Sequence, residues 1–386
     1  MLVFMNLRLS SLVFCLSFLA HAGAPFSALR LPEGGIQPQA IADDAGTIHV
    51  VYFKGDPKAG DLFYVQAKGA GFTSPVRVNS QLGSAIAMGT IRGAQIALGK
   101  AGRVHVAWNG SGVAMPKGPV NSESGDTGSP MLYSRMEASG VFEPQRNLMK
   151  KTFGLDGGGS IAADRDGNVY VVWHGKLPGA AKGEAGRRMW IAVSNDSGKS
   201  FPDEKAAWDG NVGACGCCGT AAFAAKNGDL YLLFRSATEE VHRDIYMLRS
   251  SNHGASFEGR LMDRWDINAC PMSSMSIVQD GASVIGSWET AGQVFHAPLT
   301  FGKGSATKQV PVGEGKRKHP RLAVNGKGDR LLVWTDGTGW QKGGSLAWEL
   351  LRKDGSKDAG AISGGAVVWS FGAVVAGAGE QFVLIY

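Results

Sequence analysis

The chain has 386 residues, of which 44% are hydrophobic and 19% are charged, and its formal net charge is +6. Its 56 glycines are roughly twice the average usage of about 7%. The ordinary apolar content excludes a disordered polymer, and the lack of a three-residue glycine period excludes collagen. A large all-β domain and a glycine-rich α/β enzyme remain as candidate classes.

The first 22 residues are typical of a secretory signal peptide. Arg8 supplies a positive charge, residues 9–19 form a short apolar run, and residues 20–22 match the small-x-small cleavage pattern. The apolar run is too short to span comfortably, because a membrane helix needs about 20 apolar residues. We therefore predict a signal peptide at 1–22, export to the periplasm or the medium, and no membrane span.

One pattern recurs seven times after this segment: a short apolar strand, a glycine turn, and a second strand that ends in an aromatic residue. The strands alternate or are wholly apolar, rather than following the 3.6-residue helical period. A third and a fourth strand follow most copies. The closing aromatics are Tyr52, Trp108, Trp173, Phe234, Trp288, Trp334 and Tyr386.

Four antiparallel strands per repeat, repeated radially, predict an all-β β-propeller over residues 23–386. We favour seven blades; a six-bladed ring with a displaced terminal pair is the alternative. The strand-like run at residues 26–31 is expected to pair with the last strands and close the ring, which removes exposed sheet edges. The regular aromatics are interpreted as packing between blades, and not as a sugar platform. No glycine set has a phosphate-binding spacing, which argues against the α/β class.

Two turns after third strands carry a family resemblance. Residues 194–201 fit the pattern Ser-x-Asp-x-Gly-x-x-Phe, and residues 251–257 form a weaker copy in which Asn252 replaces the Asp. The chain thus resembles the Asp-box (BNR-repeat) β-propellers of the sialidase superfamily. The cysteine triplet together with residues 242–246 resembles a secreted subgroup of unassigned activity. The resemblance implies that these turns are structural and lie opposite the active-site face.

If those turns lie on the bottom of the ring, residues before each first strand and after each second strand share the top face. Chemically active side chains gather at these positions. Before first strands come Arg92, Cys215, Cys217, Cys218, Cys270, Met272, His319 and Arg321; after second strands come Asn109, His174, Arg235, Glu289 and Asp336; Arg243 and Asp244 precede a third strand.

The four cysteines outside the predicted signal peptide fall at the starts of two neighbouring blades, so all four are expected to meet. Export favours disulfides, although a bridge within the triplet would be strained. Alternatively, Cys215, Cys217, Cys218 and Cys270 bind copper or zinc together with Met272 and His319, since thiolate, thioether and imidazole are suitable ligands. Free thiols are the third alternative.

The arginines and carboxylates form a second candidate site. Sialidases hold a sugar carboxylate with three arginines, and Arg92, Arg235 and Arg321 occupy top-face positions that would imitate such a clamp. Arg243 and Asp244 are further candidates for ligand binding, and Glu289 and Asp336 for catalysis. The match departs from the family in detail, because the first blade lacks Phe-Arg-Ile-Pro and no Tyr–Glu pair can be placed.

Three functions remain open: a secreted propeller that binds or hydrolyses a glycan or another small anionic ligand, a metal-binding or redox propeller, and an interaction scaffold without chemistry. Residues 316–318 are the one tight basic cluster, which is more typical of a solvated loop than of a polyanion site. We therefore expect no nucleic-acid partner, and we expect a monomer.

Overall fold

The computed structural model describes residues 25–122, 124–301, 311–377 and 380–386; the predicted signal peptide lies outside them. These residues form 27 strands and two short 3-10 helices, Pro32–Gly34 and Lys100–Gly102. In the described part of the chain, no helix has the length and apolarity needed to cross a membrane.

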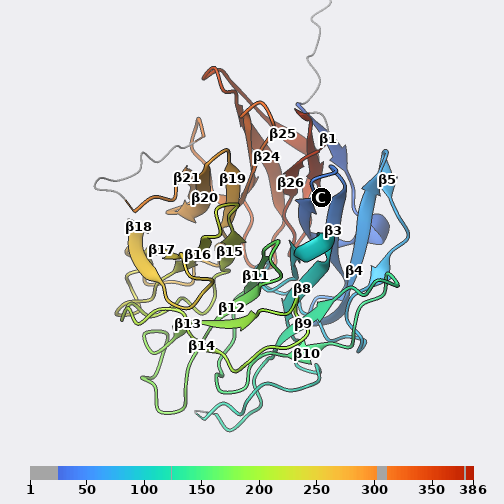
Figure 1. Ribbon diagram of the computed structural model, residues 1–386. Coiled ribbons are helices and arrows are strands. Elements are labelled where there is room, and N and C mark those ends of the chain that lie inside the picture. The colour runs from blue at the N-terminus through green and yellow to red at the C-terminus, as the bar shows by residue number, and fades with distance from the viewer. Residues whose placement is uncertain (1–24, 123, 302–310, 378–379) are drawn as a thin grey trace, which may run out of the picture.

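The strands are organised as seven sheets, which are the seven blades of a β-propeller (Figure 1). The seven-bladed prediction is confirmed, and the six-bladed alternative is excluded. Blade 1 contains β2 (Ile36–Ala42), β3 (Ile48–Asp56), β4 (Ala59–Lys68), β5 (Gly71–Phe72) and β6 (Val76–Arg77); blade 2 contains β7 (Gln95–Leu98), β8 (Val104–Asn109), β9 (Met131–Arg135) and β10 (Arg146–Asn147); blade 3 contains β11 (Ser160–Ala163), β12 (Val169–Gly175), β13 (Arg188–Ser194) and β14 (Lys205–Ala206).

Blades 4 to 6 repeat this order of antiparallel neighbours, and blade 7 adds a parallel strand to an antiparallel pair. Blade 4 contains β15 (Ala221–Ala224), β16 (Leu230–Arg235), β17 (Ile245–Ser250) and β18 (Glu258–Asp263); blade 5 contains β19 (Ser276–Asp280), β20 (Ser283–Thr290) and β21 (Gln293–Pro298); blade 6 contains β22 (Arg317–Val324), β23 (Arg330–Asp336), β24 (Gly344–Leu351) and β25 (Lys357–Ala366); blade 7 contains β26 (Ala373–Ala376), β27 (Phe382–Ile385) and β1 (Phe26–Leu29).

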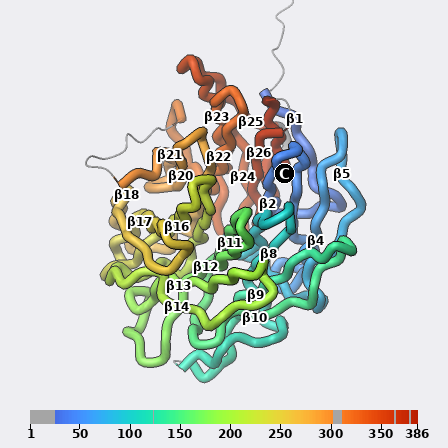
Figure 2. The backbone as a smooth tube through the Cα atoms, in the orientation of Figure 1, coloured from blue at the N-terminus to red at the C-terminus, as the bar shows by residue number. Residues whose placement is uncertain are grey.

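The first strand of each blade lies innermost. Contacts run from β2 to β7, β11, β15, β19, β22 and β26, and from β26 back to β2, so these strands surround the axis. The tube in Figure 2 follows the chain around the ring until its red C-terminal strands lie beside its blue N-terminal strands. Every residue just before a first strand is therefore placed near the axis.

The N-terminal strand β1 closes the ring by pairing with β27. The pairing is parallel, with Phe26 opposite Phe382 and Leu29 opposite Ile385. The Tyr386 backbone N–H donates to the Leu29 carbonyl (3.1 Å), which extends the pairing beyond the strand. The predicted closure is thus confirmed. Its parallel direction arises because β1 joins the outer side of a β26–β27 hairpin.

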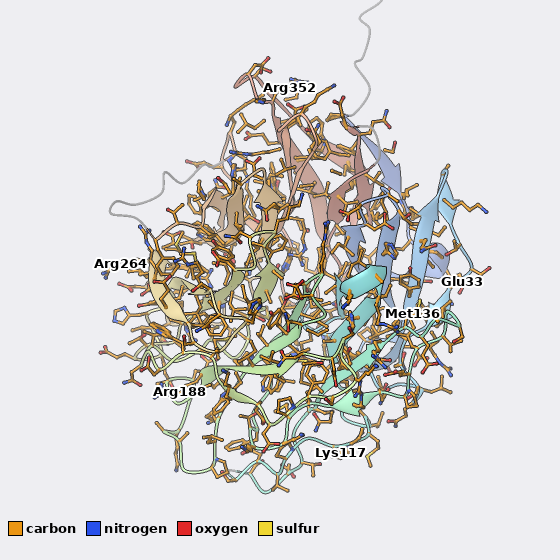
Figure 3. The ribbon with its side chains drawn as sticks, in the orientation of Figure 1. Glu33, Lys117, Met136, Arg188, Arg264 and Arg352 are labelled. Atoms are coloured by element: carbon orange, nitrogen blue, oxygen red, sulfur yellow. The ribbon has the colours of Figure 1, made fainter. Side chains whose placement is uncertain are left out.

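The aromatics that end the second strands fill the spaces between blades. Trp108, Trp173 and Trp288 are at most 1% exposed. Long charged side chains such as Arg188 and Arg352 project at the periphery instead (Figure 3). Six of the seven regular aromatics are therefore core residues, as their spacing predicted, whereas Tyr386 is half-buried and packs against the core.

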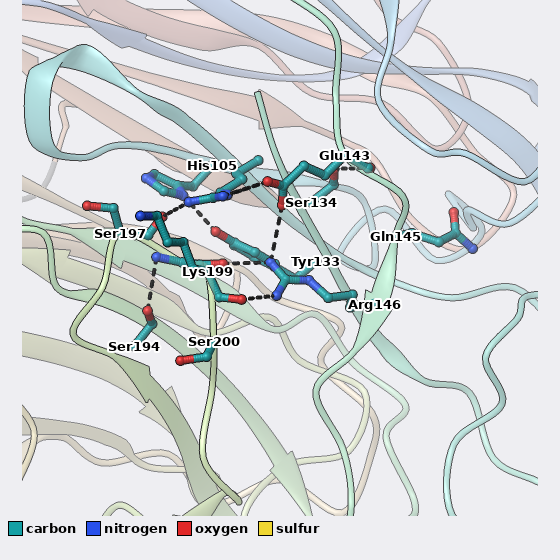
Figure 4. Close-up of polar contacts among 12 residues, drawn as sticks. His105, Tyr133, Ser134, Glu143, Gln145, Arg146, Ser194, Ser197, Lys199 and Ser200 are labelled. Carbon is teal, nitrogen blue, oxygen red and sulfur yellow. Dashed lines mark hydrogen bonds and ion pairs between the residues drawn. The ribbon is translucent and has the colours of Figure 1, made fainter. Parts of the chain in front are cut away.

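The turn after β13 joins two blades. Within it, Asp196 Oδ1 accepts hydrogen bonds from Ser194 Oγ (2.6 Å) and from the Ser200 backbone (3.0 Å). Arg146 of blade 2 donates to the backbone oxygens of Gly198 and Lys199, both at 2.6 Å (Figure 4). This end of the molecule is thus occupied by structural turns.

Candidate functional site

Residues that end a second strand contact the loop before the inner strand of the next blade. Asn109, which ends β8, donates through Nδ2 to the backbone oxygens of Asp156 (3.2 Å) and Gly157 (2.8 Å). Arg235, which ends β16, donates through Nε to Ser273 Oγ (3.1 Å) in the loop before β19. Residues that end a second strand therefore lie beside the loop that precedes the inner strand of the next blade.

Three cysteines in the loop before β15 form a buried group, the thiol cluster. The Sγ atoms of Cys215 and Cys218 lie 3.1 Å apart, and those of Cys215 and Cys217 lie 3.4 Å apart. All three sulfurs lie within 4.8 Å of one another, and no cysteine of the cluster is more than 8% exposed. Three soft donors are thus gathered at one point, shielded from water.

The loop before β19 adds a thioether to this cluster and leaves the fourth cysteine outside it. Met272 packs against the three cysteines. Cys270 is exposed and does not belong to the group, and no disulfide joins the four described cysteines. The expected meeting of four cysteines is therefore limited to three. A blade start fixes where the backbone of Cys270 lies, but not the direction of its side chain.

A half-buried acid holds the cysteine loop in place. Glu184, in the loop between β12 and β13, accepts hydrogen bonds from the Gly216 backbone N–H and from Arg243 Nη1. A Cβ at Gly216 would lie 2.7 Å from Glu184 Oε1 and 2.6 Å from Arg187 Nη1, so a side chain there would displace the ends of both of these side chains. Glu184 was not predicted from the sequence, because it belongs to no repeat position. The sequence feature that indicates a close contact here is the glycine between two cysteines.

The cluster is arranged to ionise first at Cys218. Burial opposes this ionisation, but hydrogen bonds from Cys215 and Cys217 and the charge of Arg235 hold the pKa of Cys218 well below its usual value. Hydrogen bonding to Cys215 and Cys218, reinforced by burial, raises the pKa of Cys217. Cys218 is therefore the sulfur of the cluster that ionises most readily, and the thiolate is the form that binds a cation.

Arg235 lies beneath the cluster with only neutral hydrogen-bond acceptors. Besides Ser273, it donates to the backbone oxygens of Arg243 and Glu289, and its guanidinium lies 4.9 Å from the Trp265 ring centre. Its side chain is almost fully buried, with 1% of the residue exposed. The Cys218 thiolate therefore provides this buried cation with a negative neighbour.

The other two arginines of the expected clamp also have internal partners. Arg92 forms an ion pair with Asp156. Arg321 donates through Nη1 to Ser274 Oγ (3.4 Å) and stacks on Phe371, with 4.6 Å from its Cζ to the ring centre. Together with Arg235, they are held by three different sets of partners, and no shared acceptor aligns them as a clamp.

The predicted catalytic carboxylates have contrasting surroundings. Burial raises the pKa of Glu289, although Lys318 and Arg235 oppose the shift, and its Oε2 atom has no hydrogen-bond partner. Asp336 accepts a hydrogen bond from Trp334 Nε1 (3.1 Å). No hydrogen bond between these two described residues joins the carboxyl groups.

Asp244 has a structural contact, and Asp336 has a charged one. Asp244 Oδ1 accepts the Trp265 backbone N–H (2.9 Å), which ties the loop before β17 to the loop after β18. Asp336 Oδ1 lies 3.9 Å from Arg317 Nε. The Asp244 side chain thus orders the rim of the site.

Two buried histidines flank the cluster without joining it. His319 Nδ1 lies 3.1 Å from Ser274 Oγ, and burial lowers the pKa of His319 to about 3. His174 Nε2 accepts the Gly157 backbone N–H (2.9 Å), and burial followed by the charge of Arg187 lowers its pKa to about 3. Both rings are therefore neutral at physiological pH. His319 lies outside the group of sulfurs within 4.8 Å.

The left-handed backbone conformation at Met272 and His319 recurs at equivalent positions of the repeat. Both have a left-handed φ (+46° and +55°), and so does Gln37 (+55°) of blade 1. Each lies nine residues before a turn glycine: Gly46, Gly281 or Gly328. The conformation recurs in three blades, so it shapes the start of the inner strand and does not mark a ligand site by itself.

Comparison with known proteins places this site on a widespread fold. No family model and no curated protein match the chain. A protein of unknown function from Dyadobacter fermentans is 14% identical over 86% of this chain and 95% of its own, with a TM-score of 0.52. An α-L-arabinofuranosidase variant from Fusarium graminearum is 10% identical (83% and 93% covered, TM-score 0.53), and a Hadza microbial sialidase is 12% identical (85% and 71% covered, TM-score 0.50).

Likeness at this level of identity shows a shared fold. It does not transfer an activity, because propellers present unrelated sites on the same scaffold. The thiol cluster must therefore be interpreted from its own geometry.

Proposed function

We propose that the protein binds one soft metal ion, with Cu(I) favoured over Zn(II), through Cys215, Cys217 and Cys218. The observation that carries the proposal is the gathering of three buried sulfurs within 4.8 Å of one another. Metal–sulfur bonds of about 2.3 Å in a tetrahedral site place sulfurs about 3.8 Å apart. The observed spacing needs only small side-chain rotations to reach that value.

The neighbours of the cluster favour Cu(I). The thioether of Met272 packs against the three sulfurs, and a set of thiolates with a thioether suits this ion. Arg235 and Arg243 supply positive charge beside a site that becomes anionic when three thiolates bind a monovalent ion. If the signal peptide is used as predicted, metal binding would also protect the thiols in an oxidising compartment.

Titration of the reduced protein with Cu(I), in competition with a chromogenic chelator, tests the proposal. We expect one ion per chain, and we expect Cys215→Ser and Cys218→Ser each to weaken binding by at least about 100-fold, since each removes a ligand. Cys270→Ser is the matched control and should bind like the parent chain. Cu(I) affinity that is undiminished in Cys215→Ser and Cys218→Ser would overturn the proposal. Binding of Zn(II) that is tighter than that of Cu(I) would identify zinc as the bound ion.

A glycan ligand is the second candidate. It is supported by the fold shared with two proteins whose names denote glycan-active enzymes, and by the unpaired Oε2 and raised pKa of Glu289, which are typical of a general acid. A glycosidase panel and a glycan array, each run with the parent chain and Glu289→Gln, test it. Blank results for the parent chain would remove this candidate without touching the metal site.

A further inference from the structure

A small cavity lies on the propeller axis, and Gly219, the residue that follows Cys218 of the thiol cluster, is part of its lining. It is formed where the starts of blades 2 to 6 converge, and its volume of about 10 Å³ is enough for one water-sized particle. The residues around it are small or polar, and none of those described is acidic; they include Thr90, Gln95, Gly159, Thr220, Ser274 and Arg321.

Arg321 presents an unused edge of its guanidinium group in this region. Its hydrogen bonds all come from Nη1, which donates to Ser274 Oγ (3.4 Å), the Met275 oxygen (3.3 Å) and the Pro320 oxygen (3.2 Å). Its Nε is buried without a partner, and no hydrogen bond among the described residues uses Nη2. Nε and Nη2 form the side edge of the fork that binds anions through two parallel N–H groups.

The charge of Arg321 also lacks a counterion. No ion pair of the described chain includes it, and its three hydrogen-bond acceptors are neutral. Burial lowers the pKa of Arg321 to about 10, so the group stays charged at neutral pH. An unpaired cation in a partly buried site is costly, and a bound anion would offset that cost.

Two further donors line the cavity. The Thr90 hydroxyl and the Gln95 side-chain amide lie in the lining, and no hydrogen bond among the described residues uses either. Thr220 Oγ1 already donates to the Gly158 oxygen (3.1 Å). The cavity therefore combines one cation with spare hydroxyl and amide donors, and its volume excludes a carboxylate ligand such as a sugar acid.

We propose that a single halide ion, chloride under physiological conditions, binds in the axial cavity against the Nε–Nη2 edge of Arg321. The ion would contact residues at the starts of several of blades 2 to 6 and so link these blades at the axis. This site is chemically distinct from the proposed metal site, because no cysteine lines it, although Gly219 in its wall directly follows Cys218.

Thermal unfolding in sodium chloride and in sodium gluconate at equal ionic strength tests the proposal. We expect chloride to raise the unfolding temperature by at least about 2 °C, because it binds only the folded state. Arg321→Gln should abolish this difference. Arg317→Gln is the matched control, since Arg317 also stacks on an aromatic ring (Trp334, 4.9 Å) but has a carboxylate nearby, and it should keep the chloride effect.

Crystals of the parent chain soaked in bromide give a second measurement that does not depend on a folded variant. We expect one anomalous peak beside the Arg321 side chain. Equal unfolding temperatures in the two salts, or a cavity without an anomalous peak, would overturn the halide site and leave a water molecule as its occupant. Neither result bears on Cu(I) binding, which is measured separately.

Discussion

The Sγ atoms of Cys215 and Cys218 lie 3.1 Å apart, at the two ends of a turn in which the Cys218 N–H approaches the Cys215 oxygen at 3.5 Å. This pair is buried, and hydrogen bonds from Cys215 and Cys217 help to hold the pKa of Cys218 below its usual value, against the effect of burial. Such a contact is stable only if something holds the loop, and Glu184 is the residue that does so through Gly216.

Replacement of Glu184 should weaken metal binding without removing a ligand. Glu184→Ala loses both the acceptor for the Gly216 N–H and the partner of Arg243, and we expect a 10- to 100-fold loss of Cu(I) affinity (an order-of-magnitude range). Glu184→Gln keeps one acceptor and should show a smaller loss. Glu239→Gln changes an exposed acid and serves as the control. Equal Cu(I) affinities in all three variants would show that Glu184 does not support the metal site.

Arg235 should control the ionisation of the metal-free cluster. Its charge helps to lower the pKa of Cys218, against the effect of burial. We expect Arg235→Gln to raise the apparent thiol pKa by about one pH unit or more, as loss of a nearby opposite charge does. The ultraviolet absorbance of the thiolate, followed against pH in the parent and the variant, measures the shift. Circular dichroism of the variant confirms that it is folded, and an unchanged titration would contradict the assignment.

Buried neutral histidines should make the protein sensitive to acid. Burial, followed by the charge of Arg103, lowers the pKa of His105 to about 3, below its value in the unfolded chain. Between that pKa and about 6.5, the unfolded state takes up a proton that the folded state does not, so the free energy of unfolding decreases as pH falls. We expect His105→Gln to flatten this dependence by up to about 1.4 kcal/mol per pH unit.

Denaturant unfolding at a series of pH values measures that slope. His253→Gln is the control, because the His253 side chain is 53% exposed. The slope of this control should match the parent chain. A His105→Gln variant with the parent slope would show that His105 takes up its proton over the same pH range in the folded and unfolded states.

Ring closure should contribute measurably to stability. Leu29 of β1 is 7% exposed and packs into the core of the closing blade. We expect Leu29→Ala to lower the free energy of unfolding by about 2–5 kcal/mol, the usual cost of such a truncation in a core. Ser27→Ala, on the exposed part of the same strand, should cost under about 0.5 kcal/mol. Similar stabilities for the two variants would mean that β1 does not hold the ring.

Local pattern was sufficient to predict the fold. Alternating strands and turn glycines such as Gly102 and Gly167 are local features that can be recognised within a few residues of sequence. Their sevenfold repetition predicted seven blades, and the strand-like run that begins at Phe26 predicted the closing strand. The position of the site could be predicted in the same way, because strand order places the starts of neighbouring blades side by side.

Side-chain directions and long-range partners could not be predicted. Cys270 and Met272 are two residues apart, yet one is exposed and the other packs on the thiol cluster. The partners of Arg235 include backbone oxygens, which every residue carries and which no motif reveals. Glu184 acts across 32 residues of chain to Gly216, with no spacing that marks the contact.

X-ray absorption at the copper edge, on protein loaded with one equivalent of Cu(I), is the most direct test of metal binding by the thiol cluster. We expect three sulfur neighbours at about 2.3 Å, as for other metal–thiolate bonds, and a loss of sulfur scattering in Cys218→Ser. A first shell of nitrogen or oxygen atoms, or a spectrum unchanged in Cys218→Ser, would contradict it.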